Sequence, residues 1–172
     1  MERNVAKMIT PDHYYSSVFA IPYKELRARK IRGLIFDLDN TLTAFNEELP
    51  NAKIHAFMRH LHNMGFRVCI LTNNTTGRLN KWNVDIALPG VANGLKPFTR
   101  GVRKAMRLIG TRKHNTVIIG DQLLSDIWAG KNAGITTILV KPITEKDFLF
   151  VRAKRVIERL MLRNYFRNLS RG

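Results

Sequence analysis

Short apolar runs alternate with longer amphipathic segments along the chain, a pattern typical of strands connected by helices. The apolar runs predict four strands, at residues 31–36, 66–71, 116–120 and 135–140. The amphipathic segments predict four helices, at residues 52–64, 75–82, 98–109 and 123–133. A fifth strand is at most short and lies near Val91. We therefore expect an α/β fold with a doubly wound parallel sheet and right-handed crossovers.

Residues at the ends of the first predicted helix are typical of helix termini. Asn51 is expected to cap its start and Gly65 to end it. Its apolar positions recur three and four residues apart, at Ile54, Phe57, Met58 and Leu61. In the shorter helix at residues 75–82, Arg78 and Lys81 are expected to face outward.

The two ends of the chain depart from this pattern, so we divide the sequence into three parts. These are an N-terminal arm at residues 1–30, a core at residues 31–142 and a basic helix at residues 143–172. The arm does not show a regular element, and Pro11 and Pro22 bracket a stretch with three aromatic residues. Aromatic residues beside cations suit a membrane interface, but they equally suit an arm packed on the core.

The last part has helical periodicity over residues 145–169 and is strongly basic. Nine basic and three acidic residues lie between Lys141 and Gly172. Five arginines recur three or four residues apart and form one stripe, namely Arg152, Arg155, Arg159, Arg163 and Arg167. Such a helix is a candidate for lying on an anionic membrane, and the alternative is a helix packed on the sheet with a solvated arginine face.

The whole chain is also basic, with 29 Lys and Arg against 13 Asp and Glu and a formal net charge of +16. This excess predicts an anionic partner, either a nucleic acid or an acidic membrane surface. The one cysteine, Cys69, excludes an intramolecular disulfide framework, and no apolar run approaches the ~20 residues that span a bilayer. The pattern of a signal peptide is missing, so we expect a cytoplasmic protein with peripheral contact to the inner face of the cell membrane.

Polar residues stand at the ends of the predicted strands, where open parallel sheets bind their ligands. Asp37 and Asp39 follow the first strand, Thr72 follows the second and Asp121 follows the third. Two buried carboxylates close together need a cation, and Mg²⁺ prefers oxygen ligands. The alternative to a Mg²⁺ site at Asp37 and Asp39 is a solvated turn with a helix cap at Asn40 and Thr41.

Four segments, in order, resemble the motifs of the haloacid dehalogenase (HAD) superfamily of phosphotransferases. Residues 37–41 (Asp-Leu-Asp-Asn-Thr) are similar to the DxDxT motif, and Thr72 is similar to the Thr or Ser of the second motif. Lys96 resembles the lysine of the third motif, and residues 120–126 resemble the acidic fourth motif. The resemblance covers roughly residues 31–140 and implies a three-layer, Rossmann-like fold.

This resemblance also implies a mechanism with Mg²⁺ as the cofactor. It makes Asp37 the nucleophile that forms an aspartyl-phosphate and Asp39 the general acid and base, which points to a phosphatase. The implied metal ligands are Asp37, the Asp39 backbone carbonyl and Asp121, with Asp126 either a further ligand or a support for one. The implied contacts to the phosphate come from Thr72, Asn73 and Lys96.

The spacing of these motifs leaves no room for a second domain over the site. Asp39 and Thr72 are 33 residues apart, and Thr72 and Lys96 are 24 apart, so each interval holds little more than a helix and a strand. A chain without such a cap domain resembles the type III group of the superfamily, whose open sites suit large or surface-presented substrates. Together with the net charge of +16, this favours a phosphate on a macromolecule or a lipid.

Within type IIIA, the chain resembles bacterial proteins related to phosphatidylglycerophosphatase. The segments that carry this resemblance are residues 11–21, 36–42, 71–74, 96–97 and 120–126. It implies hydrolysis of phosphatidylglycerophosphate to phosphatidylglycerol at the membrane. Two alternatives stay open: a HAD phosphatase of a soluble metabolite or macromolecule, and a nucleic-acid-binding protein on a HAD scaffold.

Overall fold

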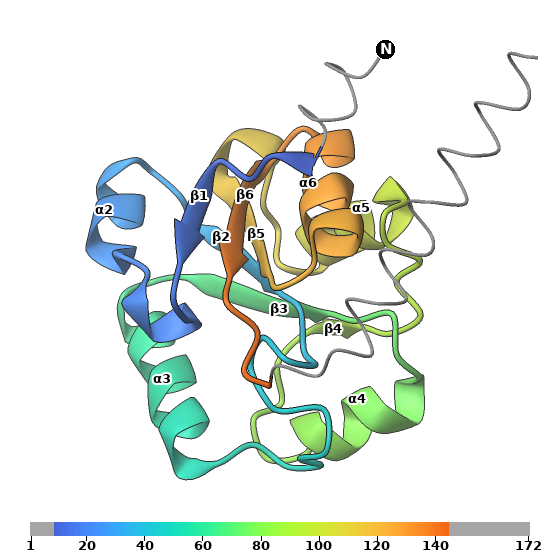
Figure 1. Ribbon diagram of the computed structural model, residues 1–172. Coiled ribbons are helices and arrows are strands. Elements are labelled where there is room, and N and C mark those ends of the chain that lie inside the picture. Colours follow the sequence, from blue (N-terminus) through green and yellow to red (C-terminus); the bar gives the residue numbers. More distant parts are fainter. Residues whose placement is uncertain (1–8, 145–172) are drawn as a thin grey trace, which may run out of the picture.

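Six parallel strands form one sheet in the computed structural model, which describes residues 9–144 (Figure 1). The strands are β1 (His13–Tyr15), β2 (Gly33–Phe36), β3 (Arg67–Leu71), β4 (Gly90–Val91), β5 (Thr116–Gly120) and β6 (Thr136–Val140). Their order across the sheet is β1-β6-β5-β2-β3-β4. The predicted parallel α/β sheet is confirmed, and each of the four long strands lies within two residues of its expected bounds.

Helices cover both faces of the sheet and give the fold three layers (Figure 1). One face carries α2 (Tyr23–Ala28), α3 (Ala52–Asn63) and α4 (Thr76–Asn83), and the other carries α5 (Thr99–Leu108) and α6 (Trp128–Ala133). A short 3-10 helix, η2 (Lys113–Asn115), precedes β5. Successive residues of β2 point to opposite layers, since Phe36 shares a core with Phe57 of α3, whereas Ile35 shares one with Val102 of α5. Burial on both faces explains why this strand is apolar throughout.

The ends of α3 follow the local signals of the sequence, whereas the start of the last predicted helix does not. The Asn51 side chain accepts a hydrogen bond from the Ile54 amide at 3.0 Å and caps α3 as predicted. Gly65 follows α3 with a φ of 78°, a left-handed conformation that glycine adopts without strain. The helix predicted at residues 123–133 is instead a π-helical turn, η3 (Leu123–Ile127), followed by α6.

The N-terminal arm is part of the sheet, so the expectation that it holds no regular element is wrong. β1 pairs in parallel with β6, and a 3-10 turn, η1 (Val18–Ala20), leads to α2. The Asp12 carboxylate accepts hydrogen bonds from the amide and the hydroxyl of Thr137, at 2.8 and 2.9 Å, and from Lys131 at 2.5 Å. A strand of three residues is too short to show a periodicity, which is why the hydrophobic pattern does not reveal it.

Several apolar side chains of the arm, within its described residues 9–30, pack on the core. Val18, Ile21, Tyr23 and Leu26 are buried. The Tyr23 hydroxyl donates to the Val18 carbonyl at 2.8 Å, and its ring meets Phe57 and Phe66 edge to face. Two large apolar side chains of the arm stay exposed, Tyr14 at 59% and Phe19 at 41%. These contacts favour the interpretation of an arm packed on the core, while the division of the chain at residues 30 and 142 stays a prediction.

The predicted basic helix lies outside the described part of the chain from residue 145 onward. Within residues 9–144, no helix combines the length and the apolar character that crossing a bilayer requires.

Candidate active site

The chain reverses its direction across the sheet at β2. It runs outward from β2 through β3 to β4 and then returns to β5, on the other side of β2. A switch point of this kind leaves a crevice at the carboxyl ends of the strands, where α/β proteins bind ligands. Asp37 follows β2 at this point, and its amide donates to the Ile119 carbonyl of β5 at 2.9 Å.

A cavity of about 260 Å³ opens at this crevice and collects most of the predicted site residues. It is lined by Asp37, Asp39, Phe45, Thr72, Asn73, Asn74, Lys96, Gln122 and Ser125. Five of the seven predicted site residues are among them. The other two, Asp121 and Asp126, each bring a carboxylate oxygen within 4.8 Å of one on Asp37. The fold therefore assembles the whole predicted set at one place, although the role of each residue stays a prediction.

Lys96 is buried between two carboxylates. Its Nζ donates to Oδ1 of Asp37 and to Oδ1 of Asp126, each at 2.5 Å, and to the Leu71 carbonyl at 3.1 Å. Its side chain is 2% exposed. Burial alone would lower the pKa of Lys96, but the Asp126 and Asp37 carboxylates outweigh burial and raise that pKa above its ordinary value. Lys96 therefore stays protonated and gives the site a fixed positive charge.

The backbone of Lys96 is held by the side chain of Asn73. Oδ1 of Asn73 accepts from the Lys96 amide at 2.8 Å, and its Nδ2 donates to the Lys96 carbonyl at 3.1 Å. Thr72 beside it is buried, and its Oγ1 accepts from the Asn74 amide at 3.0 Å. A hydroxyl that accepts in this way still has its hydrogen to donate to a ligand. The structure thus uses Asn73 to position Lys96 and turns Thr72 toward the cavity.

The carboxylates of Asp37, Asp121 and Asp126 fit a divalent cation. One oxygen of each lies within 4.8 Å of one oxygen of the other two. Burial raises the pKa of Asp37 to about 8, although the charge of Lys96 acts in the opposite direction. Burial also raises the pKa of Asp121 to about 7, although the Thr41 hydroxyl donates to its Oδ1 at 3.0 Å. Carboxyl groups that resist ionisation on their own are suited to a site completed by a cation, and divalent cations such as Mg²⁺ bind carboxylate oxygens.

Asp126 reaches this cluster because Gly120 has no side chain. A Cβ atom on Gly120 would lie 2.3 Å from Cγ and Oδ2 of Asp126. The π-helical turn supports the same placement, since the amides of Asp126 and Ile127 both donate to the Gln122 carbonyl, at 2.9 and 3.2 Å. The Gln122 amide in turn donates to Oδ2 of Asp126 at 3.1 Å. This wide turn directs the carboxylate toward the sheet, which explains why the predicted helix does not begin as a regular α-helix.

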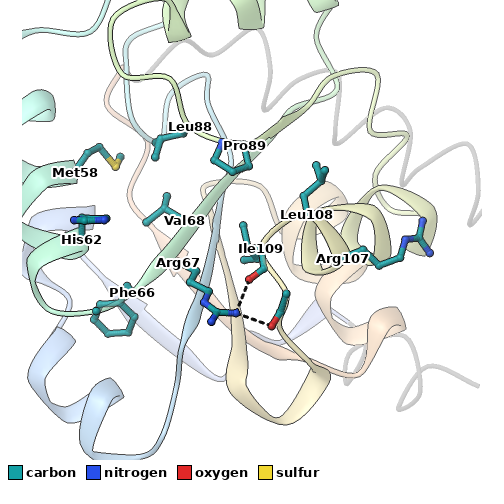
Figure 2. Close-up of a pocket in the computed structure, with 12 residues that line it drawn as sticks. Met58, His62, Phe66, Arg67, Val68, Leu88, Pro89, Arg107, Leu108 and Ile109 are labelled. Atoms are coloured by element: carbon teal, nitrogen blue, oxygen red, sulfur yellow. Dashed lines mark hydrogen bonds between the residues drawn. The ribbon is translucent and has the colours of Figure 1, made fainter.

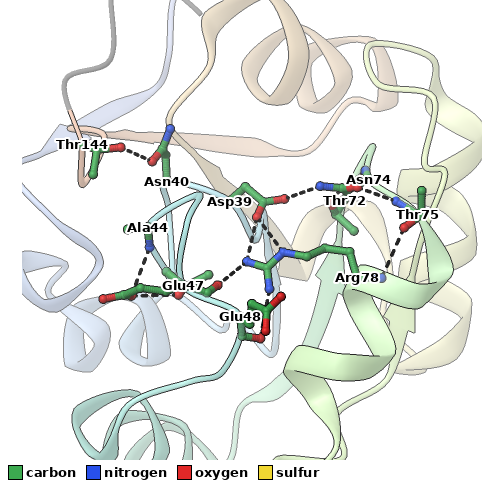
Figure 3. Close-up of polar contacts among 11 residues, drawn as sticks. Asp39, Asn40, Ala44, Glu47, Glu48, Thr72, Asn74, Thr75, Arg78 and Thr144 are labelled. Carbon is green, nitrogen blue, oxygen red and sulfur yellow. Dashed lines mark hydrogen bonds and ion pairs between the residues drawn. The ribbon is translucent and has the colours of Figure 1, made fainter.

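Asp39 lies at the same edge of the sheet but has different partners (Figure 3). Nε and Nη2 of Arg78 donate to its Oδ1 at 3.2 and 3.0 Å, and Nδ2 of Asn74 donates to its Oδ2 at 3.2 Å. The expectation that Arg78 faces outward is therefore wrong, because its side chain is only 15% exposed. Thr75, which caps α4 by accepting from the Arg78 amide at 3.2 Å, starts this helix beside the loop that carries Asp39.

Arg78 also fastens the loop that follows β2. Its Nη1 donates to the Glu48 carbonyl at 3.0 Å and its Nη2 to the Glu47 carbonyl at 2.7 Å (Figure 3). The Glu48 side chain forms an ion pair with Lys81. One guanidinium thus joins α4, Asp39 and this loop. The sequence carries only a weak signal for this role, namely the helix cap three residues before Arg78.

A larger cavity, of about 670 Å³, lies at the opposite end of β3 (Figure 2). Its lining residues are Met58, His62, Gly65, Phe66, Arg67, Val68, Leu88, Pro89, Arg107, Leu108, Ile109 and Gly110. Nη1 of Arg67 donates to the carbonyls of Ile109 and Gly110 there, at 3.2 and 3.0 Å. None of the lining residues carries a carboxylate, so the smaller cavity with the acidic cluster is the candidate active site.

Comparisons with known proteins agree with this fold. The HAD-hydrolase-like family model matches residues 95–146, which contain Lys96, Asp121 and Asp126. The "Probable phosphatase YqeG" of Bacillus subtilis (strain 168) is 31% identical over 156 residues, which are 91% of this chain and 91% of that protein. The fold, the site and these matches define a phosphoric monoester hydrolase. The chain belongs to the haloacid dehalogenase (HAD) superfamily of phosphatases.

Two further similarities extend the comparison. "Phosphatidylglycerophosphate phosphatase 1, chloroplastic" of Chlamydomonas reinhardtii is 26% identical over 151 residues, which are 80% of this chain and 55% of that protein. The cobalt-bound deoxy-D-mannose-octulosonate 8-phosphate phosphatase (YrbI) from Haemophilus influenzae matches with a TM-score of 0.51 at 16% identity, over 66% of this chain and 80% of that one. At this identity the second similarity shows the fold alone. The chain spans about half the length of the chloroplast relative.

Proposed function

We propose that the protein is a Mg²⁺-dependent phosphomonoester hydrolase that works through an aspartyl-phosphate at Asp37. The observation that carries this proposal is the buried cluster at the end of β2, where Lys96 joins Asp37 to Asp126 beside Asp121. Displacement at a phosphorus that bears negative charge needs a nucleophile, fixed positive charge and a proton donor. Asp37, Lys96 and Asp39 offer these three around one cavity.

In the first step, a carboxylate oxygen of Asp37 forms a bond to phosphorus while the bond from phosphorus to the ester oxygen breaks. Lys96, held by Asp126, offsets the combined negative charge of Asp37 and the phosphoryl group. The Thr72 hydroxyl donates to a phosphoryl oxygen. The residues that would hold Mg²⁺ are Asp37, Asp121, Asp126 and the Asp39 backbone carbonyl, and the bound ion would neutralise phosphoryl oxygens.

Asp39 transfers the protons in both steps. Its carboxylic acid gives a proton to the leaving alkoxide, and the resulting carboxylate then takes a proton from a water molecule. That water attacks the phosphorus of the aspartyl-phosphate, which releases inorganic phosphate and restores Asp37. This assignment is supported by the position of Asp39 in the lining of the same cavity, with its orientation set by Arg78 and Asn74.

We further propose that the substrate is phosphatidylglycerophosphate, which the enzyme meets while in peripheral contact with an anionic membrane. Two observations support this choice: the chloroplast relative carries that activity in its name, and the net charge is +16. Between the strands of residues 9–144, the longest connection contains only a loop and α3, so we propose that the enzyme has no cap domain. A phosphate presented at a lipid surface needs an open site of this kind.

The test is Mg²⁺-dependent release of phosphate from phosphatidylglycerophosphate in mixed micelles, with glycerol phosphate and an aryl phosphate as soluble substrates. We expect the lipid to be preferred, a chelator to abolish the reaction, and Asp37→Asn to lower kcat by about 10⁴-fold or more on every substrate.

The outcomes separate the candidate functions. Equal or better turnover of the soluble phosphates would keep the phosphatase and contradict the lipid substrate. Hydrolysis that survives in Asp37→Asn would contradict the aspartyl-phosphate mechanism. A protein that hydrolyses none of them but binds RNA with a steep salt dependence would favour the nucleic-acid-binding alternative.

A further inference from the structure

Six large apolar side chains stand exposed around the mouth of the candidate active site. They are Phe45, Leu49, Leu95, Phe98, Leu123 and Ile143, each at least 40% exposed. Every one of them follows the carboxyl end of a strand: β2 precedes the first two, β4 the next two, and β5 and β6 one each. We propose that these six side chains, the apolar rim, insert into an anionic bilayer and seat the active site on its surface. The choice of a lipid partner rests on the proposed function.

Contacts place the apolar rim around the candidate active site. Phe45 lines the same cavity as Asp37. Leu95 and Leu123 are the chain neighbours of two further lining residues, Lys96 and Gln122. Three loops that carry the chemistry therefore also carry exposed apolar side chains.

The other three members of the apolar rim are fixed by hydrogen bonds of the same loops. The amide of Ile143 donates to the Asn40 carbonyl at 2.9 Å, which joins the end of β6 to the loop after β2. Leu49 follows Glu48, whose carbonyl accepts from Arg78. The amide of Phe98 donates to the Leu95 carbonyl at 2.8 Å, so both side chains project from one turn around Lys96. The apolar rim thus lies on loops that hydrogen bonds hold at the carboxyl edge of the sheet.

Six of the ten large apolar side chains that stand exposed within residues 9–144 belong to the apolar rim. Only four other large apolar side chains of residues 9–144 are comparably exposed: Tyr14, Phe19, Val84 and Leu108. These four are scattered over β1, η1, the end of α4 and the end of α5. One of them, Phe19, also packs edge to face on Phe57 at a centroid distance of 5.0 Å. Scattered apolar side chains are normal on a protein surface, whereas a group around one site indicates a partner.

The charge beside the apolar rim favours an anionic bilayer as that partner. Helix α5 begins directly after Phe98 and carries exposed cations in its first two turns, at Arg100, Arg103 and Lys104. Apolar side chains at the acyl boundary with cations at the level of the headgroups are the arrangement by which proteins bind one leaflet of a membrane. The net charge of +16 acts in the same direction.

The first test measures binding of the full chain to vesicles of phosphatidylglycerol and phosphatidylcholine by sedimentation, without any substrate. The rim variant is Leu49→Ser, Phe98→Ser and Ile143→Ser, at side chains that are 54%, 71% and 51% exposed. The matched control is Tyr14→Ser, Val84→Ser and Leu108→Ser, at side chains that are 59%, 67% and 49% exposed. We expect the rim variant to bind about 30-fold more weakly than the wild type and the control to stay within about threefold.

The second test reports insertion directly. Cys69 is fully buried and burial raises its pKa to about 12, so this thiol does not react with a maleimide label at neutral pH. An environment-sensitive fluorophore at Phe98→Cys is expected to shift to shorter wavelength when vesicles are added. The same fluorophore at Val84→Cys is expected to keep its spectrum.

Three results would contradict the proposal that the apolar rim inserts into a bilayer. The first is a wild-type protein that fails to bind anionic vesicles, and the second is equal binding of the rim and control variants. A fluorophore at residue 98 that keeps its spectrum while the protein is bound would be the third. Both triple variants should hydrolyse a soluble aryl phosphate like the wild type, which shows that the active site is intact. Vesicle binding through the rim in a protein that leaves phosphatidylglycerophosphate unchanged would support the rim and contradict the lipid substrate. The two proposals can therefore fail separately.

Discussion

Two pairs of opposite charges stand at the same edge of the sheet and differ in their exposure to water. Lys96 is 2% exposed between Asp37 and Asp126, and its amine donates to both. Arg78 and Asp39 are each 15% exposed, and Arg78 shares its donors between the Asp39 carboxylate and two backbone carbonyls. A fully buried charge that loses its partner is left without solvation, whereas water reaches a partly exposed pair and can replace a lost partner. Lys96 thus gives the site a fixed positive charge, whereas Arg78 holds the Asp39 carboxylate in one orientation.

The largest effect should follow removal of the buried cation. Lys96→Met leaves Asp37 and Asp126 without their shared donor, so we expect a loss of about 3–5 kcal/mol in the free energy of unfolding and a fall of about 10³-fold in kcat. Urea unfolding in a chelator and phosphate release in Mg²⁺ measure the two. Lys81→Met, which removes a cation from an exposed ion pair, is the control. Unchanged stability of the Lys96 variant would contradict the contrast between the two pairs.

A methyl group at Gly120 should disturb the buried pair without removing a charge. Gly120→Ala forces Asp126 away from Lys96, since the new Cβ would lie 2.3 Å from the carboxylate. We expect a loss of about 1–3 kcal/mol in the free energy of unfolding and of about 10²-fold in kcat. The matched control is Gly77→Ala in α4, where the nearest atom is 3.9 Å away and alanine should stabilise the helix. Equal behaviour of the two variants would show that Asp126 does not depend on the space at Gly120.

The metal should bind more tightly as the pH rises. The pKa values of Asp37 and Asp121 are raised to about 8 and about 7 in the folded protein, from 3.8 in an unfolded chain. Without metal, unfolding releases these protons, so the free energy of unfolding falls as the pH rises from 3.8 to these values. A divalent cation offsets that loss and releases the protons. Between pH 6 and 8, we expect the apparent affinity for Mg²⁺ to rise about tenfold per pH unit for each proton released. Thermal unfolding with and without Mg²⁺ measures this, and Asp121→Asn should flatten the dependence.

The smallest of these effects should come from the partly exposed pair, Arg78 and Asp39. Arg78→Ala frees the Asp39 side chain, and we expect a fall of about tenfold in kcat on alkyl phosphates with a loss of no more than about 1 kcal/mol in the free energy of unfolding. An aryl phosphate, whose leaving group needs no proton, should lose less. Burst kinetics with the aryl phosphate separate the two chemical steps. An equal loss on both classes of substrate in the first step would show that Arg78 does not act through Asp39.

Two kinds of feature could be predicted from the sequence. The first are helices and strands with a long hydrophobic pattern, and the second are polar residues that follow strands and therefore meet at the carboxyl edge of the sheet. The strand at β2 and the cap and stripe of α3 follow from local preferences that the tertiary structure supports. Asp37, Lys96 and Asp126 are 30 or more residues apart, yet their places after strands bring them together once the sheet is parallel.

Other features depend on contacts that no local pattern encodes. Arg78 looks like any exposed helical cation until the loop after β2 is placed against it. The π-helical turn at η3 depends on the space beside Gly120. Likewise the exposure of Leu95 and Phe98 beside the candidate active site is set by the fold and by no local pattern.

The pairing of β1 with β6 also constrains how the protein is made. Asp12 and Thr137, which tie these two strands together, are 125 residues apart. A growing chain releases β1 early, but the partner strand leaves the ribosome only after the four strands between them. The edge of β1 must therefore wait unpaired while about 125 further residues are made, which at 5–20 residues per second takes roughly 6–25 seconds. Formation of this edge is expected to be a late, post-nucleation event of folding, because closing so long a loop is costly before the rest of the sheet exists.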